Sequence, residues 1–344
     1  MDREELKEDK WPFIPGGLLE AAVQQSERAR QSHALEVCAT TEWAIADGGV
    51  SFVVSRAEKF PGKSQDNQPQ DNQSQADPAE NDKPEADPFQ NNGIACPSPN
   101  PDSNPFIDYD ENLFVADVSA THVCLLNKFP VMANHLLIVT RRLESQESLL
   151  SLQDFEALFA GLCGLADPSG PGALGFYNGG RLAGASQPHK HLQLVRLPIG
   201  REGPALPLEP LIVAARSDRL VDAVPDVPFR HAFAWLDPDL KERPLAAAAT
   251  AHKVYHGMLD TLFPAPKDAA WKREGCQPAP YNLLVTSRWM LLVPRVADEF
   301  ASIPVNALGY AGSFFIWSDD QWDALRAHKP MTVLAAVALP RLQR

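Results

Sequence analysis

Apolar residues recur with two different periods along this chain, and the two periods predict both helices and strands. Phe155, Leu158, Phe159 and Leu162 recur at the spacing of one helix face, just after Ser151 in an N-cap position. Helical patterns are also predicted over residues 17–36 and 245–263. Short apolar runs predict strands, at residues 42–45, 50–55, 122–126, 135–140, 173–177, 189–197, 281–286 and 289–294.

The order of these elements predicts an α+β fold. Residues 128–134, which include Pro130, form a turn between two of the strands, and an antiparallel pair follows from so short a connection. Apolar segments at 322–327 and 331–339 close the chain. Because strands are grouped with helices that can pack on them, we expect a mainly antiparallel central sheet flanked by helices.

Residues 64–104 interrupt this pattern. The segment is dominated by Gln, Asn, Asp and Pro, and Phe89 and Ile94 are its large apolar residues. It cannot bury enough apolar surface to offset the entropy of ordering its chain, so we expect a disordered or loosely draped insertion.

The net charge of −13 over 344 residues excludes a nucleic-acid coat protein, because phosphate binding on that scale needs Lys and Arg. Eight acidic residues and one lysine in 64–104 account for −7, which leaves −6 for the rest. Residues 181–196 instead hold three basic residues and no acidic one. The pattern favours a small, locally basic pocket for a phosphorylated ligand.

The sequence contains no apolar run of the ~18 residues that a membrane span needs, and the charged start MDREELKEDK is unlike a secretory signal. Five scattered cysteines form no CxxC motif. We therefore expect free thiols, neither a zinc ribbon nor a disulfide scaffold, and a cytoplasmic location.

The run PHKHLQLV carries the most informative chemistry. If residues 189–195 form a strand, His189, His191 and Gln193 share one face, about 6.6 Å apart at ~3.3 Å rise per residue. Upstream glycines at 179, 180 and 184 allow backbone N–H groups to approach an anion, and Ser186 adds a hydroxyl. A histidine beside an anion cradle suits nucleophilic attack on phosphorus. A two-histidine metal site and a purely structural pair remain alternatives.

In its setting this run resembles the HxHxQ signature of the transferase branch of the histidine-triad superfamily, and more closely the diadenosine tetraphosphate phosphorylases, or ATP adenylyltransferases. Three further segments resemble that family in the same order: 112–141, 281–295 and 305–312, with HVCLLNKFP, NHLLIVTR and YNLLVTSRWMLLVPR among them. The resemblance runs from about residue 16 to 338, outside the insertion.

The resemblance implies a covalent mechanism. His191 would be the nucleophile that forms an adenylyl-histidine on the α-phosphorus and releases ATP, after which phosphate takes the adenylyl group as ADP. His189 and Gln193 would complete the catalytic set. Gln193 stands where hydrolytic relatives carry a histidine, and since an amide cannot supply a proton, we expect it to favour phosphate over water as acceptor.

The resemblance also implies a set of substrate-binding residues. Asn178 and the loop Gly184, Ala185, Ser186 and Gln187 would face phosphate, Asn127 and Lys128 the ribose, Lys63 (with Lys59 as competitor) the polyphosphate, and Asn282, Thr286 and Arg295 the second nucleotide. Each also has a plain structural alternative. His135 is expected to be structural, and a metal role for the i, i+4 pair His252 and His256 is disfavoured because Lys253 stands where HExxH has glutamate.

Four segments follow: residues 1–63 as N-terminal helix and strands, 64–104 as insertion, 105–200 as a histidine-triad-like core, and 201–344 as an ATP adenylyltransferase segment completing the site. Mg²⁺ is expected with the polyphosphate, with no metal held by the protein. We expect small-molecule partners, no nucleic acid or membrane, and a monomer or homodimer.

Alternative functions are a nucleotidyltransferase with another acceptor, like galactose-1-phosphate uridylyltransferase, and a non-catalytic dinucleoside polyphosphate sensor.

Overall fold

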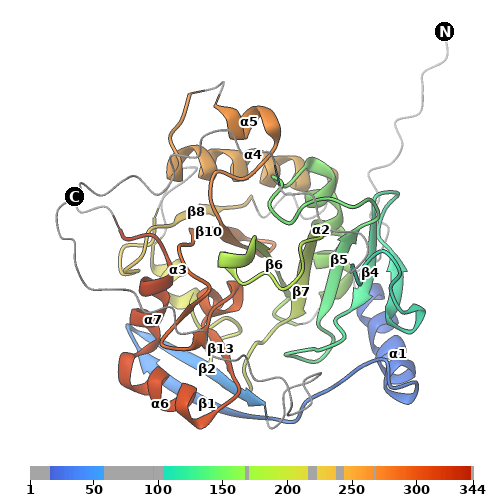
Figure 1. Cartoon of the computed structure of the whole chain (residues 1–344), viewed down its shortest axis with the longest axis horizontal. Helices are drawn as coiled ribbons and strands as arrows, with labels where there is room; N and C mark the ends of the chain where they lie inside the picture. The colour runs from blue at the N-terminus through green and yellow to red at the C-terminus, as the bar shows by residue number, and fades with distance from the viewer. Residues whose placement is uncertain are drawn as a thin grey trace, which may run out of the picture.

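A computed structural model describes residues 16–57, 96, 104–166, 170–215, 223–237, 244–266 and 269–341, arranged around one large sheet (Figure 1). The helices are α1 (Gly17–Gln31), α2 (Leu152–Leu165), α3 (Glu209–Ala214), α4 (Pro244–Leu262), α5 (Ala270–Glu274), α6 (Asp319–His328) and α7 (Pro330–Val337). Three short 3-10 helices are η2 (Glu111–Leu113), η3 (Arg181–Ala183) and η5 (Ala307–Ala311).

The strands are β1 (Thr40–Asp47), β2 (Val50–Ala57), β3 (Phe114–Asp117), β4 (His122–Leu126), β5 (Leu136–Thr140), β6 (Ala173–Gly179), β7 (His191–Arg196), β8 (Ala232–Trp235), β9 (Tyr281–Val285), β10 (Trp289–Pro294), β11 (Glu299–Phe300), β12 (Ile303–Pro304) and β13 (Ser313–Ile316). Eight of them form a sheet in the order β3-β4-β5-β7-β6-β9-β10-β8. Every neighbouring pair in it is antiparallel, which confirms the predicted α+β class.

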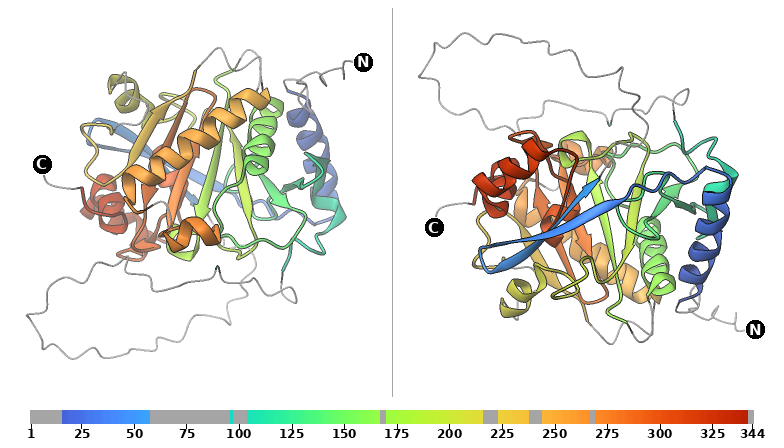
Figure 2. Two further views of the ribbon diagram at one scale, coloured as in Figure 1. Left: turned by 90° about the horizontal axis from the view of Figure 1, so that it is seen from above. Right: turned by 90° about the horizontal axis from the view of Figure 1, so that it is seen from below.

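Both faces of the large sheet are covered, which explains why its strands read as continuous apolar runs. Helices α1, α2 and α4 lie side by side over one face (Figure 2, left). The other face packs against the small sheet β1-β2-β13 and the C-terminal helices. Successive residues therefore enter different cores: Leu194 packs with α2 and α4, whereas Val195 packs with the β2 layer.

The N-cap prediction for the second helix is confirmed. Ser151 Oγ accepts a hydrogen bond from the Asp154 backbone N–H, and the Ser151 N–H donates to the Asp154 carboxylate, so both halves of a capping box are present. The first helix is shorter than predicted. It ends at Gln31, and the N–H groups of Ala34 and Leu35 turn back to the Ala29 carbonyl.

The expectation that all cysteines are free is wrong for this structure. Cys96 and Cys276 form a disulfide, while Cys38, Cys124 and Cys163 take part in none. The partners lie 180 positions apart, so no local spacing motif could reveal the pair. Apart from Cys96 and Asn104, the 64–104 insertion lies outside the described residues.

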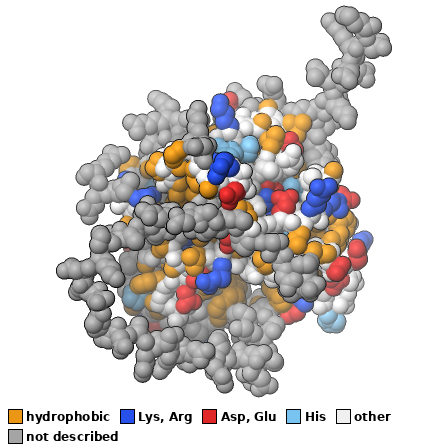
Figure 3. All heavy atoms as spheres, turned by 45° about the horizontal axis from the view of Figure 1, so that its top comes forward, with side chains coloured by type: hydrophobic (Ala, Val, Ile, Leu, Met, Phe, Trp, Pro, Cys, Tyr) orange, Lys and Arg blue, Asp and Glu red, His pale blue; other side chains and the backbone are white. Residues whose placement is uncertain are grey.

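Figure 3 shows acidic and basic side chains interspersed over one face of the molecule, in keeping with the small charge that remains outside the insertion. None of the helices in the described part of the chain has the length and apolarity needed to cross a membrane.

Candidate active site

His191 begins β7 and presents one imidazole nitrogen for chemistry. Its Nδ1–H donates to the backbone carbonyl of His189 at 2.8 Å, which fixes the tautomer and leaves the lone pair on Nε2. Within the described residues no hydrogen-bond partner occupies Nε2. Burial lowers the pKa of His191 from 6.5 to about 4. The ring is therefore neutral at pH 7, which is the protonation state that a nucleophile needs.

His189 precedes β7, to which it was predicted to belong, and pairs with Ser145 in an isolated bridge. Its Nε2–H donates to the carbonyls of Thr140 and Arg142 at 2.9 and 3.0 Å, and Nδ1 accepts from the Asn104 amide at 2.9 Å. Both nitrogens are thus engaged. His189 also holds His191 through its backbone carbonyl, and its expected place in the catalytic set stays a prediction.

Phe106 covers the two histidines. Its ring centroid lies 5.2 Å from that of His191 and 5.8 Å from that of His189. The Phe106 N–H donates to the side-chain oxygen of Asn104, whose amide nitrogen faces His189. The end of the insertion therefore belongs to the site. The sequence analysis missed Asn104 because it assigned this residue to a segment without structure, and it assigned no role to Phe106.

Gln193 shares its sheet face with His191 and is oriented by His135. The His135 Nε2–H donates to Gln193 Oε1 at 2.8 Å, and the Asn127 amide donates to His135 Nδ1 at 3.2 Å. With its oxygen occupied, Gln193 keeps its NH₂ group to donate to a phosphoryl oxygen. His135 was expected to be structural; it instead sets the direction of a predicted catalytic side chain.

The glycine-rich loop after β6 approaches the C-terminal segment closely. Gly184 has φ +85°, and a Cβ there would lie 2.9 Å from Asn306 Cβ and Val305 O. Only glycine fits this contact without displacement of the neighbouring backbone. Gly184 and Ala185 line a cavity, whereas Ser186 is exposed and Gln187 half-buried on the way to the signature strand.

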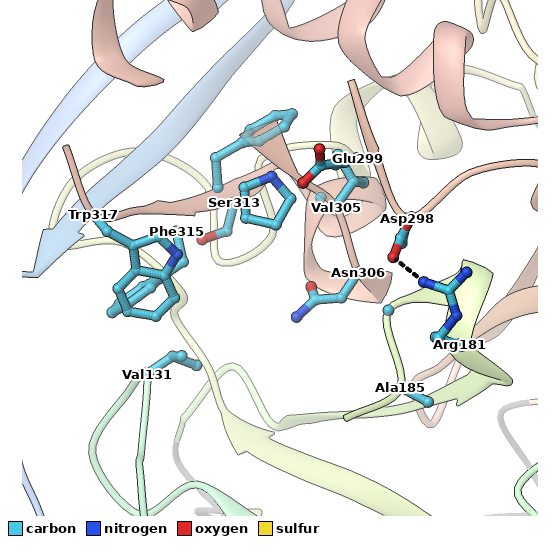
Figure 4. Close-up of a pocket in the computed structure, with 14 residues that line it drawn as sticks. Val131, Arg181, Ala185, Asp298, Glu299, Val305, Asn306, Ser313, Phe315 and Trp317 are labelled. Atoms are coloured by element: carbon cyan, nitrogen blue, oxygen red, sulfur yellow. Dashed lines mark hydrogen bonds and ion pairs between the residues drawn. The ribbon is translucent and has the colours of Figure 1, made fainter. Parts of the chain in front are cut away.

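That cavity has a volume of about 300 Å³ and two distinct ends. Phe315 and Trp317 form its aromatic end, with ring centroids 4.6 Å apart. Figure 4 shows Arg181 at the opposite end, paired with Asp298. The remaining lining residues are Val131, Gly184, Ala185, Glu299, Pro304, Val305, Asn306, Gly309, Ser313 and Phe314. An aromatic wall beside a cationic loop suits a nucleotide.

A second cavity, of about 150 Å³, adjoins the first through Val131, which lines both. It is bounded by the turn between β4 and β5, including Asn127 and His135. Asn127, which was predicted to face the ribose, thus lines a cavity. Lys128 is exposed and its Nζ lies 3.5 Å from a Glu36 carboxylate oxygen.

Three residues predicted to face the substrate, Asn178, Asn282 and Arg295, are buried and hydrogen-bonded within the protein instead. Asn178 Oδ1 accepts from the Asn282 amide at 2.8 Å and from the Ala307 N–H at 3.0 Å. Arg295 is buried and donates to Asn282 and to the carbonyls of Val305 and Val337. These bonds hold β6 and β9 against the segment that lines the larger cavity. The side chains therefore shape the site without facing it.

Thr286 lies at the other end of β9 from Asn282. It is buried, and its hydroxyl accepts from the N–H groups of Arg288 and Trp289 in the β9–β10 turn. The structure thus places Thr286 away from the loop and both cavities, and a direct nucleotide contact has no geometric support. Lys63 and its competitor Lys59 lie outside the described residues.

Lys190 points to the helical face, away from the cavities. Its ammonium pairs with Glu144 at 2.8 Å and Asp154 at 3.2 Å, and Asp154 also meets His122 Nε2 at 2.9 Å. These partners keep the buried charge compensated. Of the three basic residues in 181–196, Arg181 is the one lining the larger cavity, so the predicted basic pocket rests on fewer charges than expected.

His252 and His256 face each other on α4, with Nε2 atoms 3.1 Å apart. The described residues contain no cluster of three or more His, Cys, Asp or Glu side chains suited to a metal ion.

Comparisons with known proteins agree with this geometry. A family model of the Ap4A phosphorylase N-terminal domain matches residues 8–93 and 90–214, and one of the ATP adenylyltransferase C-terminal domain matches 225–340. Diadenosine 5',5'''-P1,P4-tetraphosphate phosphorylase 2 of Saccharomyces cerevisiae is 29% identical over 238 residues, which cover 62% of this chain and 68% of that protein. Protein APA1 of the same yeast is 30% identical over 205 residues, covering 57% and 61%.

The fold matches as well. The crystal structure of yeast Ap4A phosphorylase Apa2 in complex with Ap4A superposes with a TM-score of 0.71 at 21% identity, covering 96% of this chain and all of that one. The two family models together span nearly the whole chain, and the first alone spans more than half. The chain therefore belongs to the Ap4A phosphorylase and ATP adenylyltransferase family of nucleotidyltransferases.

Proposed function

We propose that this enzyme cleaves diadenosine tetraphosphate with inorganic phosphate, giving ATP and ADP, and that the reaction is reversible. The observation that carries the proposal is the neutral, buried imidazole of His191, whose Nδ1 is fixed by the His189 carbonyl and whose Nε2 has no hydrogen-bond partner among the described residues. Yeast relatives named as phosphorylases of this substrate support the choice of substrate.

In the first step, the Nε2 lone pair of His191 forms a bond to the α-phosphorus, and the bond from that phosphorus to the bridging oxygen breaks. ATP leaves with that electron pair, and no proton is required. The imidazole then carries a positive charge, which the His189 carbonyl at Nδ1 stabilises. In the second step a phosphate oxygen attacks the same phosphorus, the N–P bond breaks, and ADP forms with neutral His191 restored.

The two cavities that meet at Val131 suit the two nucleosides of this substrate. The smaller one, with Asn127, takes the transferred adenosine. The larger one takes the second nucleotide, with its base at Phe315 and Trp317 and its phosphates toward the loop and Arg181.

A divalent cation enters this scheme with the substrate. The larger cavity offers two carboxylates, Asp298 and Glu299, and Asp298 already pairs with Arg181. That set suits a cation carried by the polyphosphate, where it reduces the charge that must be bound. A monomeric or homodimeric state belongs to the same proposal.

Incubation with diadenosine tetraphosphate, with and without phosphate, tests the function. ATP plus ADP formed only with phosphate is expected. ATP plus AMP would indicate a hydrolase, and binding without turnover would indicate the sensor.

A further inference from the structure

Strands β6 and β7 part at the catalytic histidine. Their antiparallel register runs from Ala173↔Arg196 to Phe176↔Gln193 and stops there. Beyond that pair, neither Tyr177 and Leu192 nor Asn178 and His191 pair with each other. The separation leaves backbone polar groups on the facing edges of the two strands without a ladder partner.

The side chain of Gln146 fills this gap. Its Oε1 accepts from the His191 N–H at 2.8 Å, and its Nε2–H groups donate to the carbonyls of Asn178 at 2.8 Å and His191 at 3.2 Å. The amide therefore binds both backbone groups of His191, as a neighbouring strand would. No residue type but Gln or Asn offers a neutral acceptor and two donors on one planar group.

Gln146 is itself held firmly. Its side chain is buried, its N–H donates to the Pro188 carbonyl at 2.8 Å, and its carbonyl accepts from the Tyr177 hydroxyl. The preceding residue, Ser145, bridges to His189. Every polar group of Gln146 thus engages β6 or the signature segment, which ties the two strands together around the nucleophile.

We infer that Gln146 is a positioning residue for the nucleophile, fixing the His191 backbone so that Nε2 is aimed at the α-phosphorus. The inference rests on the proposed adenylyl-histidine. A misplacement of about 1 Å at a reacting atom lowers a rate by about 10²-fold, and the His191 side chain can be no better placed than its backbone. Gln146 touches neither cavity, so its loss acts on the chemical step rather than on binding.

Gln146→Glu keeps the shape of the side chain and the oxygen that accepts from the His191 N–H. It replaces the donating NH₂ group by a second carboxylate oxygen, which faces the carbonyls of Asn178 and His191. We expect single-turnover adenylylation of His191 to slow by about 10²-fold near pH 8, with KM within about threefold of wild type. Repulsion and burial raise the pKa of the new carboxyl, and its protonated form can donate again. Lowering the pH toward about 5 should therefore partly restore the rate of this variant but not raise that of wild type.

Two further variants complete the test. Gln146→Met removes all three hydrogen bonds and should be slow at every pH. Gln277→Met is the matched control, because Gln277 donates to the Gly179 carbonyl nearby without touching His191, and it should retain the wild-type adenylylation rate. Circular dichroism confirms folding, and if Gln146→Met is unfolded, the pH dependence of Gln146→Glu decides.

The outcomes separate this inference from the proposed function. Wild-type protein that forms no adenylyl-enzyme refutes the proposed function. If wild type does form it, a folded Gln146→Glu that reacts at the wild-type rate near pH 8 overturns the inference. A slow variant without recovery at low pH, or one whose KM rises as much as its kcat falls, overturns it as well.

Discussion

The imidazole of His135 donates to the side-chain oxygen of Gln193 across 2.8 Å, so the third position of the signature is held by a histidine from the neighbouring strand. Burial lowers the pKa of His135 to about 4, so the donor is a neutral ring. The Gln193 amide is left as a donor that cannot release a proton at neutral pH.

Replacing Gln193 by His should therefore change the acceptor. A second imidazole at this place can accept a proton from water, so we expect more ATP plus AMP relative to ATP plus ADP. Chromatographic product ratios at fixed phosphate measure this, with Gln193→Asn as the control that keeps an amide. An unchanged ratio would contradict the assigned role.

His191→Gly should lower turnover by at least ~10³-fold, because no other described residue offers a free imidazole at this position. Mass spectrometry after mixing with substrate should find an adenylyl adduct on wild type and none on the variant. Retained turnover by folded His191→Gly would exclude the covalent mechanism.

The acid limit of activity should lie well below the ordinary histidine range. The pKa of free His191 is lowered to about 4, so the fraction of neutral nucleophile stays high until the pH falls toward that value. Phe106→Ala admits water to the ring, and the acid limb of kcat/KM should move up toward 6.5. Identical pH profiles for both proteins would show that Phe106 does not control this desolvation.

The same burial predicts a dependence of stability on pH. The pKa of each of His135, His191 and His231 is lowered to about 4 by desolvation, so between about pH 4 and 6.5 the unfolded chain binds more protons than the folded one. Unfolding free energy should therefore rise as the pH increases through this window. Urea titrations at several pH values measure it, with His231→Gln expected to flatten the rise.

The Cys96–Cys276 disulfide should contribute to stability. Cys276→Ser is expected to lower the unfolding free energy by about 2–4 kcal/mol under oxidising conditions and to abolish the effect of a reductant. Cys163→Ser serves as the control, since Cys163 is free. Equal stability of wild type with and without reductant would show that the bond does not form in solution.

Trp317→Ala should weaken binding of the second nucleotide. Loss of base stacking costs about 1–3 kcal/mol, so KM should rise by roughly 5- to 150-fold. A fall in kcat with unchanged KM would place the base elsewhere.

Local pattern was sufficient for most strands of the central sheet and for the helix that begins after Ser151, but it missed the short strands β3, β8 and β13. The capping box at Ser151 and Asp154 and the apolar strand runs depend on neighbours in sequence, and they were predicted with small errors at their ends. His191 and Gln193 were found because strand alternation puts both on one face. The identity of the chemistry came from the order of several motifs.

Local sequence patterns could not predict contacts between segments that are distant in the chain. Three such contacts lie at the site: Asn104 with His189, His135 with Gln193, and Gln146 with His191. The residue types in these pairs are also common in purely structural roles, so residue type alone does not reveal the contacts. Asn282 and Arg295 were predicted to contact the second nucleotide, yet in the fold they hydrogen-bond to each other and to buried backbone carbonyls.

By itself the sequence determined the α+β class and the family, because periodicity and motif order are properties of the chain. The tertiary structure decided which polar groups are buried and which nitrogen of His191 is free. It also decided that Lys190, the lysine of the signature, pairs with carboxylates instead of facing phosphate. Those outcomes depend on which strands separate and what fills the gap, and burial then sets the proton affinity of each histidine.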